Sequence, residues 1–251
     1  MRTDLFSVEG RVACVTGASS GIGRAIASFL AQSGAHVIGI ARRADALDAW
    51  RAETDGKTAA LAADLSDPDT MSQVAAKAAE PFGAPDILIN AAGVNMRQHA
   101  DEVTAEGWRT TLDLNLSTPF FLGQALVPGM RAKGWGRIVN FASLQSERAF
   151  ANGIAYGASK GGVAQMTRAM AEAWSKDGIT TNALAPGFFP TELTGPVFGN
   201  AELSARNAAQ TCIGRNGALE DLAGPTLFLC SASSDYVTGQ VLYVDGGFTA
   251  K

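Results

Sequence analysis

Short runs of β-branched and other apolar residues alternate with segments of helical periodicity along almost the whole chain. This alternation is typical of βα units, in which parallel strands form a sheet that is covered by helices on both faces. The apolar runs predict strands over residues 12–16, 36–41, 58–62, 86–90, 137–142, 179–184 and 241–244. We therefore predict an α/β fold with a doubly wound, seven-stranded parallel sheet.

The sequence predicts a single domain spanning residues 1–251. This length lies in the range in which one α/β domain buries a sizeable core. Periodicity is weakest from residue 186 to about residue 200, directly after the sixth predicted strand. Loops that follow strand ends build the site of such sheets, so residues 186–210 are predicted to form a substrate loop. A plain surface connection is the alternative.

Composition and charge narrow the classes of partner. Twenty basic and 24 acidic side chains give a net charge of −4, which argues against a nucleic-acid partner and favours a small-molecule substrate. No apolar run approaches the roughly 18 residues of a membrane helix, so we expect no membrane partner. The first ten residues lack the features of a signal or transit peptide, which predicts a cytoplasmic protein. Three scattered cysteines and two histidines predict neither disulfides nor a metal site.

A glycine-rich segment, TGASSGIG, follows the first predicted strand and opens a helix. Glycines allow a tight turn and a close approach of the backbone to a pyrophosphate, whose charge the helix N-terminus favours. Structural glycines in a βα turn are the alternative interpretation. The position after strand one favours a dinucleotide site, whose candidate residues are Gly17, Ser19, Ser20, Gly21, Ile22 and Gly23.

The second predicted strand ends in two arginines, Arg42 and Arg43, with no Asp or Glu. In such sites a carboxylate at this position accepts a hydrogen bond from the ribose 2′-hydroxyl, whereas a cation accommodates a 2′-phosphate. The pattern predicts that NADP(H) is preferred over NAD(H), with Arg42 as the main reason. NAD(H) stays possible, and the alternative is that both arginines only begin a solvated helix.

Tyr156 and Lys160 are four residues apart in a predicted helix over 153–175, so their side chains share one face. A nearby ammonium lowers the pKa of a phenol and makes it a usable acid/base. Ser143 directly follows the fifth predicted strand, so its hydroxyl is expected at the carboxyl end of the sheet. These three residues are candidates for the catalytic site.

Taken together, these motifs resemble those of the short-chain dehydrogenase/reductase family. The matching segments are TGASSGIG, NAAG at 90–93, Asn115, Ser143, YGASK at 156–160, the PG of Pro186 and Gly187, and the VDGG that ends at Gly247. The similarity covers almost the whole chain, and independently placed motifs agree in order and spacing. One departure is Ala91, where the family usually has a second asparagine. The resemblance implies a Rossmann-type fold and a homotetramer.

The resemblance also implies roles for particular residues. Tyr156 would be the catalytic acid/base, Lys160 would hold the nicotinamide ribose and lower the phenol pKa, and Ser143 would orient the substrate oxygen. Asn115 would sustain a water-linked proton relay from Lys160. The remaining cofactor contacts that the family implies are Asp64, Leu65, Asn90, Gly93, Pro186, Gly187 and Thr191, together with Tyr156 and Lys160. Capping or turn roles are the alternatives for Asp64 and Thr191.

Pro119 adds a physical detail to the role of Asn115. It lies four residues after Asn115 within a predicted helical run over 108–126. Proline has no N–H to donate, so the carbonyl group of Asn115 is expected to be free to bind a water molecule. An ordinary proline kink is the alternative.

Two polar stretches, 93–97 and 143–148, follow the fourth and fifth predicted strands and lie beside the expected reaction centre. Asn95 and Gln145 could bond hydroxyl groups and Arg97 could bind a carboxylate, alongside Ser143 and Tyr156. These stretches resemble gluconate 5-dehydrogenases and related sugar-acid or polyol dehydrogenases, which implies NADP-dependent interconversion of a secondary alcohol and a ketone. The alternatives are a reductase of 3-oxoacyl thioesters of acyl carrier protein and a catalytically idle dinucleotide-binding scaffold. For Arg97, pairing with Asp101 or Glu102 is the alternative.

Overall fold

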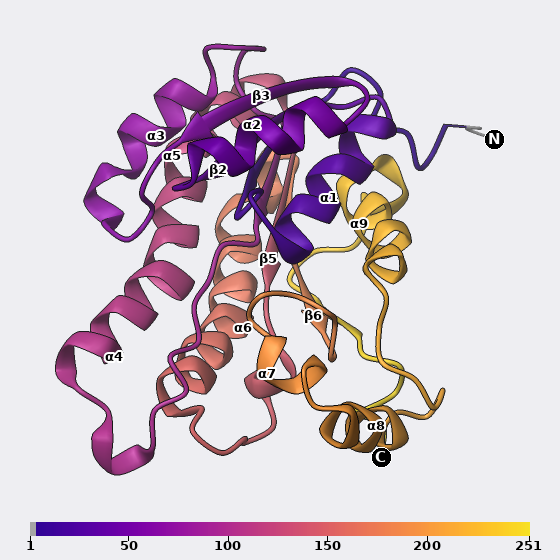
Figure 1. The fold of residues 1–251 in the computed structure, drawn as a ribbon. Coiled ribbons are helices and arrows are strands. Elements are labelled where there is room, and N and C mark those ends of the chain that lie inside the picture. Colours follow the sequence, from indigo (N-terminus) through magenta and orange to yellow (C-terminus); the bar gives the residue numbers. More distant parts are fainter. Residues whose placement is uncertain (1–3) are drawn as a thin grey trace.

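A computed structural model of the chain describes residues 4–251 and contains one seven-stranded sheet (Figure 1). All strand pairs are parallel, in the order β3-β2-β1-β4-β5-β6-β7. The strands are β1 Val12–Thr16, β2 His36–Ala41, β3 Lys57–Ala62, β4 Ile87–Asn90, β5 Gly136–Phe141, β6 Ile179–Pro186 and β7 Val241–Val244. The predicted doubly wound sheet is confirmed. The strand order reverses between β1 and β4, and ligands bind at this kind of switch point.

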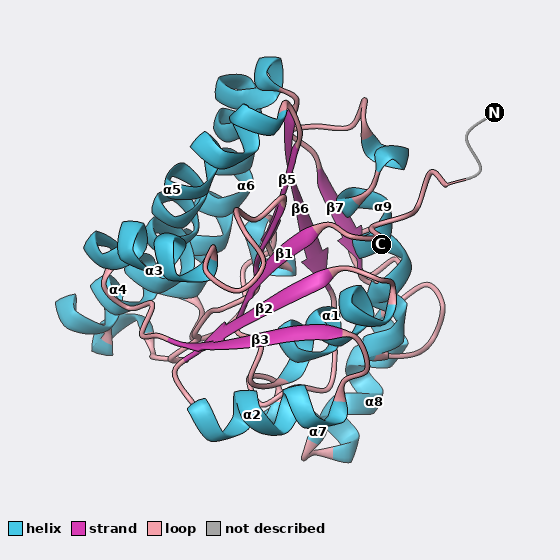
Figure 2. Cartoon of the chain, turned by 90° about the horizontal axis from the view of Figure 1, so that it is seen from above, coloured by secondary structure: helices cyan, strands magenta, loops and turns pink. Residues whose placement is uncertain are grey.

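Helices cover both faces of the sheet (Figure 2). On one face lie α1 (Gly21–Gln32), α2 (Ala44–Glu53) and α9 (Ala223–Cys230). The other face is covered by α3 (Met71–Ala78), α5 (Thr118–Lys133) and α6 (Ile154–Trp174), with α4 (Ala105–Leu112) leading into α5. Two further helices, α7 (Gly195–Phe198) and α8 (Ala201–Gln210), follow β6. Among residues 4–251, no helix is both long and apolar enough to cross a bilayer.

The central strands are apolar because both of their faces are buried. In β1, Ala13 and Val15 pack into the cluster under α1, whereas Val12 and Cys14 pack into the cluster under α3 and α5. This twofold alternation of sides is the geometry of a strand. Cys14 is fully buried there and acts as a small core residue.

The helical run predicted over 108–126 contains a wide turn. Asp113–Ser117 form a π-helical turn between α4 and α5, and Thr118 N donates to the carbonyl oxygen of Asp113. Pro119, at the start of α5, cannot donate a fourth-residue hydrogen bond. Wide turns of this kind often occur at functional sites, and this one carries the buried Asn115.

The segment after β6 is more ordered than its sequence pattern indicated. The weakly periodic stretch 186–200 contains α7, and α8 follows within the predicted loop 186–210. A helix of four residues, with Pro196 in its first turn, is too short to show a periodic pattern. In α8 the Asn200 side chain caps the helix by accepting a hydrogen bond from Leu203 N at 3.0 Å.

Candidate active site

The predicted site motifs converge at the carboxyl ends of β1, β4, β5 and β6. Gly17 follows β1, Gly93 follows β4, Ser143 follows β5 and Gly187 follows β6. Because all these strands are parallel, their carboxyl ends lie along one edge of the sheet. The topology therefore assembles residues that are far apart in the sequence.

The glycine-rich turn has the shape that a dinucleotide phosphate needs. Gly17 has a φ of +73°, and a Cβ there would lie 3.0 Å from Ala92 N. A Cβ on Gly23 would lie 2.4 Å from the Gly17 carbonyl oxygen, so any side chain would force the turn apart. Ser20 precedes α1 with extended backbone, and its hydroxyl makes no capping bond to the helix. The residues present therefore fit a pyrophosphate at this helix N-terminus.

Arg43 reaches across this turn to a carboxylate on the segment after β6. Its guanidinium donates from Nη1 to Glu192 Oε1 and from Nη2 to Glu192 Oε2, both at 3.1 Å. Nη2 also lies 3.0 Å from Ser20 Oγ and 3.2 Å from Ser19 Oγ, and Ser20 Oγ donates to Glu192 Oε2 at 3.0 Å. We name these four residues the arginine–glutamate cluster. Arg42, by contrast, is exposed and makes no hydrogen bond within residues 4–251.

The arginine–glutamate cluster was missed by the sequence analysis. The sequence analysis named Arg42 as the main phosphate ligand, although Arg43 is its neighbour. Only the tertiary structure determines which of the two arginines faces the glycine-rich turn. Glu192 had no sequence signal, because its partner Arg43 is 149 positions away in the chain.

Tyr156 lies in the first turn of α6, half-buried beside Ser143. Burial raises the pKa of its phenol, while the nearby Ser143 hydroxyl and the charge of Arg97 act in the opposite direction. The Ser143 hydroxyl also accepts from Gln145 N at 3.1 Å, which fixes the turn that follows β5. Ser143 thus lies beside Tyr156, and its catalytic role stays a prediction.

Lys160 is buried on the same face of α6, one turn after Tyr156, and its ammonium group points to the end of β5. Its Nζ donates to the carbonyl oxygen of Phe141 at 2.6 Å and lies 5.6 Å from the centroid of the Tyr156 ring. Burial lowers the pKa of Lys160 to about 8. Burial is the largest cause of the raised pKa of Tyr156, and the effect of Lys160 on this phenol stays a prediction.

Asn115 joins the loop after β4 to α6. Its Oδ1 accepts from Val94 N at 2.8 Å, and its Nδ2 donates to Val94 O at 2.9 Å and to Ser159 Oγ at 3.1 Å. Ser159 Oγ in turn donates to the carbonyl oxygen of Tyr156 at 2.7 Å. A Cβ on Gly93 would lie 3.1 Å from Asn115 Oδ1 and 3.9 Å from Lys160 Nζ. These contacts bring Asn115, Gly93 and Lys160 together, and they reveal a positioning role for Ser159 that the sequence analysis missed.

Other predicted cofactor residues have structural partners of their own. The Asn90 side chain points into the sheet, where Nδ2 donates to Asn140 Oδ1 at 2.9 Å, so a cofactor contact would involve its main chain. Leu65 is buried in the core. Asp64 accepts from Ser66 N at 2.9 Å, and this bond, with the charge of Arg42, holds the pKa of its carboxyl below the ordinary value.

The segment after β6 packs onto the glycine-rich turn through Thr191. A Cβ on Gly21 would lie 3.1 Å from Thr191 Cβ. The Thr191 hydroxyl is engaged with Thr194 Oγ1 at 2.9 Å. Gly187, after Pro186 at the end of β6, lies so close to Asp245 that a Cβ would come within 2.8 Å of its Cα. A glycine is therefore required at position 187.

The loop after β4 places two of the predicted substrate residues, Asn95 and Arg97, beside Tyr156. Asn95, Arg97 and Tyr156 line one small hollow together with Met96 and Ile154. Arg97 has a φ of +52°, which is uncommon for a residue with a side chain, and Asn95 Oδ1 accepts from its N–H at 3.2 Å.

Arg97 and Gln145 each contact a neighbouring segment. Arg97 Nη2 donates to Leu193 O at 3.1 Å; the alternative pairing with Asp101 or Glu102 is not formed in the described chain. Gln145 lies against Gly153 and Gly157 at the start of α6. It is therefore close to Tyr156, which lies between these two glycines in the sequence.

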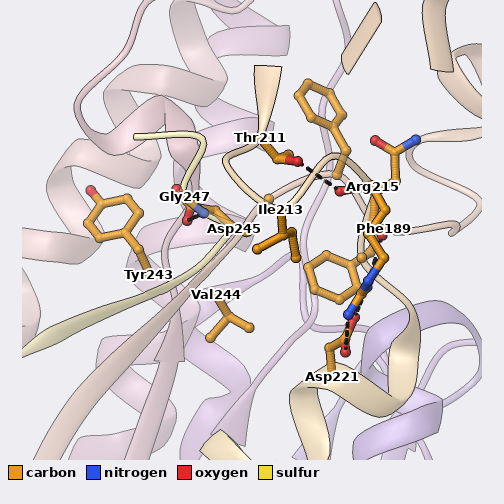
Figure 3. Close-up of a pocket in the computed structure, with 14 residues that line it drawn as sticks. Phe189, Thr211, Ile213, Arg215, Asp221, Tyr243, Val244, Asp245 and Gly247 are labelled. Carbon is orange, nitrogen blue, oxygen red and sulfur yellow. Dashed lines mark hydrogen bonds and ion pairs between the residues drawn. The ribbon is translucent and has the colours of Figure 1, made fainter. Parts of the chain in front are cut away.

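A larger pocket of about 320 Å³ lies next to this site (Figure 3). Phe189, Ile213, Val244 and the ion pair of Arg215 with Asp221 line it. Of the predicted site residues, its lining contains only Gly187 and none of the four predicted catalytic residues. The pocket is therefore not lined by the proposed acid/base residues.

Comparisons with known proteins agree with this geometry. The sequence model of the enoyl-(acyl carrier protein) reductase family matches residues 17–249. The chain is 41% identical to a gluconate 5-dehydrogenase of Gluconobacter oxydans over 98% of its length and 97% of that protein. It is 36% identical to a 3-oxoacyl-(acyl-carrier-protein) reductase of Vibrio cholerae, over 96% of this chain and 98% of that protein.

Solved structures show the same similarity. A gluconate 5-dehydrogenase from Burkholderia cenocepacia, in complex with NADP and tartrate, has a TM-score of 0.93 at 35% identity and covers 99% of this chain and 98% of its own. A second structure, with bound NADP, is of a Beutenbergia cavernae protein described as an NAD(P)-dependent gluconate 5-dehydrogenase. It has a TM-score of 0.92 at 41% identity and covers 98% of this chain and 100% of its own. With the fold, the motifs and the relatives in agreement, this chain belongs to the short-chain dehydrogenase/reductase family of oxidoreductases.

Proposed function

We propose that this protein is an NADP(H)-dependent dehydrogenase that interconverts a secondary alcohol and a ketone on a small sugar acid or polyol, as a gluconate 5-dehydrogenase does. The observation that carries this proposal is the convergence of Tyr156, Ser143, Lys160 and Asn115 beside a loop that presents Arg97. This arrangement joins a proton-transfer group to a cationic subsite.

Tyr156 is the acid/base of the proposed reaction. A bound nicotinamide dinucleotide supplies the hydride donor or acceptor. In reduction, the phenol gives its proton to the substrate oxygen; in oxidation, the phenolate takes the proton of the alcohol. The raised pKa of Tyr156 keeps the phenol protonated at neutral pH, which favours reduction there and oxidation at alkaline pH. Ser143 orients the substrate oxygen through its hydroxyl.

We propose that Lys160 and Asn115 support the proton transfer by resupplying the Tyr156 phenol. A lysine whose pKa is about 8 exchanges protons readily near neutral pH. Asn115 fixes the loop at Val94 and, through Ser159, the first turn of α6. We propose that these residues return a proton to Tyr156 through a water molecule at the wide turn.

Arg97 supports a sugar acid as the substrate class. Its guanidinium lies close enough to influence the Tyr156 phenol, and a planar guanidinium binds a carboxylate well. Asn95 in the same hollow can bond a hydroxyl group. Relatives named for gluconate, and a neighbour that holds tartrate, point to the same polar substrate class.

The arginines after β2 support NADP(H) as the preferred cofactor. The end of β2 offers no carboxylate to a ribose 2′-hydroxyl, and Arg42 and Arg43 follow it directly. We keep Arg42 as a candidate for the 2′-phosphate and add Arg43, which faces the glycine-rich turn. Four solved neighbours contain NADP.

Reduction of 3-oxoacyl thioesters is the second candidate function. The similarity to the Vibrio cholerae reductase favours it, whereas the polar hollow at Asn95 and Arg97 opposes it. A catalytically idle scaffold is less well supported, because it would have no need of the whole acid/base set.

We further propose a homotetramer in the cytoplasm. Phe121 on α5 and Leu242 on β7 are exposed apolar side chains on two different surfaces, as two kinds of subunit contact would require. Measurement of the mass in solution tests the assembly.

A substrate panel tests the proposed function. Pure protein is mixed with NADP⁺ or NAD⁺ and an aldonate, a neutral polyol or a simple secondary alcohol, and with NADPH and a 3-oxoacyl thioester, while the absorbance of reduced nicotinamide is followed. We expect turnover of the aldonate with NADP⁺. Efficient reduction of the thioester with no turnover of sugar acids or polyols would contradict the proposal.

A further inference from the structure

Glu192 lies among donors that a dinucleotide phosphate would also use. Its carboxylate accepts from both terminal nitrogens of Arg43 and from the hydroxyl of Ser20. The dinucleotide pyrophosphate is expected at the N-terminus of α1, where Ser20 lies, and a 2′-phosphate at the end of β2, where Arg43 lies. The carboxylate of Glu192 thus engages the cation and the hydroxyl that flank both phosphate positions.

These contacts also keep the carboxylate charged. The hydrogen bonds from Arg43 and Ser20 hold the pKa of Glu192 below its ordinary value. The pair is nevertheless exposed: 49% of the Arg43 side chain and 65% of the Glu192 side chain are accessible. Ion pairs this exposed are weak, so an incoming phosphate with two negative charges can displace the carboxylate.

The position of Glu192 couples this contact to the predicted substrate loop. Thr191, its neighbour, packs against the glycine-rich turn at Gly21, and Leu193, on its other side, accepts from Arg97. Besides this packing, the loop has polar contacts at two points, with Arg43 on the cofactor side and with Arg97 on the substrate side. Release of Glu192 removes the polar contact on the cofactor side alone.

We propose that Glu192 is a specificity-determining residue of the dinucleotide site: it acts as an internal anion that competes with the cofactor phosphates for Arg43 and Ser20, and that holds the loop over the glycine-rich turn until a phosphate replaces it. The inference rests on the proposed use of NADP(H). It implies that the native protein binds NADPH more weakly than a variant in which Arg43 and Ser20 are free of the Glu192 carboxylate. NADH, which has no 2′-phosphate to claim the freed Arg43, gains less from removal of the carboxylate.

Binding of NADPH and NADH to Glu192→Gln, measured by fluorescence titration without substrate, tests the competition. Glutamine keeps the size and removes the charge. We expect the Kd for NADPH to fall about two- to fivefold, the range of an exposed ion pair, and the Kd for NADH to fall less. The matched control is Glu202→Gln, because Glu202 is exposed on α8 of the same loop and makes no ion pair within residues 4–251. An unchanged or higher Kd for NADPH in Glu192→Gln overturns the proposal.

Two further measurements separate the failure of this inference from that of the proposed function. In an Arg43→Ala background, Glu192→Gln should leave the Kd for NADPH unchanged; a gain as large as in the native background overturns the pairing with Arg43. Hydrogen exchange of residues 188–199 in the protein alone should be faster in Glu192→Gln than in the native chain or in Glu202→Gln. Equal exchange rates overturn the holding role. Failure of the native protein to bind NADPH would contradict the proposed cofactor and the competition, while the exchange experiment would still decide the holding role.

Discussion

The ammonium group of Lys160 donates a hydrogen bond to the main-chain carbonyl of Phe141 at a distance of 2.6 Å. This bond ties α6 to the end of β5, two residues before Ser143. It also holds a cation in a buried position, where its pKa falls to about 8. Lys160 therefore costs stability in its protonated form while it supports the proton transfer proposed for Tyr156.

Replacement of Lys160 by methionine should make the protein more stable at neutral pH and less active. The lysine pKa is about 8 when folded and 10.5 in the reference state, so between these values the unfolded chain binds more protons, and native stability rises with pH. Below pH 8 the full penalty of the buried charge is present. We expect Lys160→Met to gain about 1–2 kcal/mol at neutral pH, after loss of the bond to Phe141.

Thermal denaturation across a pH series checks this expectation. The advantage of Lys160→Met over the native chain should shrink as the pH rises from about 8 towards 10.5. Lys176→Met is the control, because Lys176 is exposed. A gain in Lys160→Met that stays constant across the series would show that burial of charge is not its cause.

Tyr156→Phe should lower turnover by roughly 100- to 10,000-fold, because it removes only the transferable proton. The Kd for NADPH should change little. Tyr236→Phe is a matched control, since Tyr236 is fully exposed and lies outside the site. Steady-state kinetics and cofactor titration provide the two readings; activity of Tyr156→Phe within a few-fold of the native protein would remove the residue from its proposed role.

Asn115→Ala should destabilise the protein by about 2 kcal/mol, since the Val94 N–H and C=O lose their shared partner. It should also lower kcat more than it raises KM, because the proposed proton relay loses its anchor, whereas Arg97 keeps its own bond to Leu193. Asn200→Ala, which loses one capping bond on an exposed helix, should cost about 1 kcal/mol without a change in kcat. Urea denaturation and kinetics compare the two variants, and equal effects would argue against a special role for Asn115.

Arg97→Ala should raise the KM for an aldonate about tenfold or more, as expected for loss of a charged hydrogen bond. The KM for a neutral polyol of the same length should change much less. Arg109→Ala, an exposed arginine on α4, serves as the control. If the KM values of both substrates rose equally in Arg97→Ala, the arginine would act by holding Leu193 and the loop, and direct binding of the carboxylate would be wrong.

The fold could be predicted because its signals are local. Strands buried on both faces appear as apolar runs, as in Val12–Thr16, and every predicted strand is present. Gly23 is required by a close backbone approach within its own turn, whereas the close approach at Gly17 is to the backbone of Ala91 and Ala92 after β4. The short helix Gly195–Phe198 was not predicted, because four residues are too few to show a helical pattern of apolar positions.

The parts of the site that could not be predicted depend on contacts across the fold. The sequence placed Lys160 and Tyr156 on one helix face, but only the packing against β5 directs the ammonium towards Phe141. The pairing of Arg43 with Glu192 likewise depends on how the loop after β6 folds over the glycine-rich turn. Residue type and spacing indicated the chemistry; the partner of each charge required the tertiary structure.

The central claim is that this site serves a sugar-acid dehydrogenase that uses NADP(H). The most direct test is the ratio of kcat/KM for oxidation of gluconate with NADP⁺ to that with NAD⁺, measured on the native protein, with reduction of a 3-oxoacyl thioester by NADPH as the comparison. We predict NADPH formation from gluconate, a ratio well above one and weak reduction of the thioester. A ratio of one, or rapid thioester reduction with no oxidation of gluconate or any other sugar acid, would contradict the account.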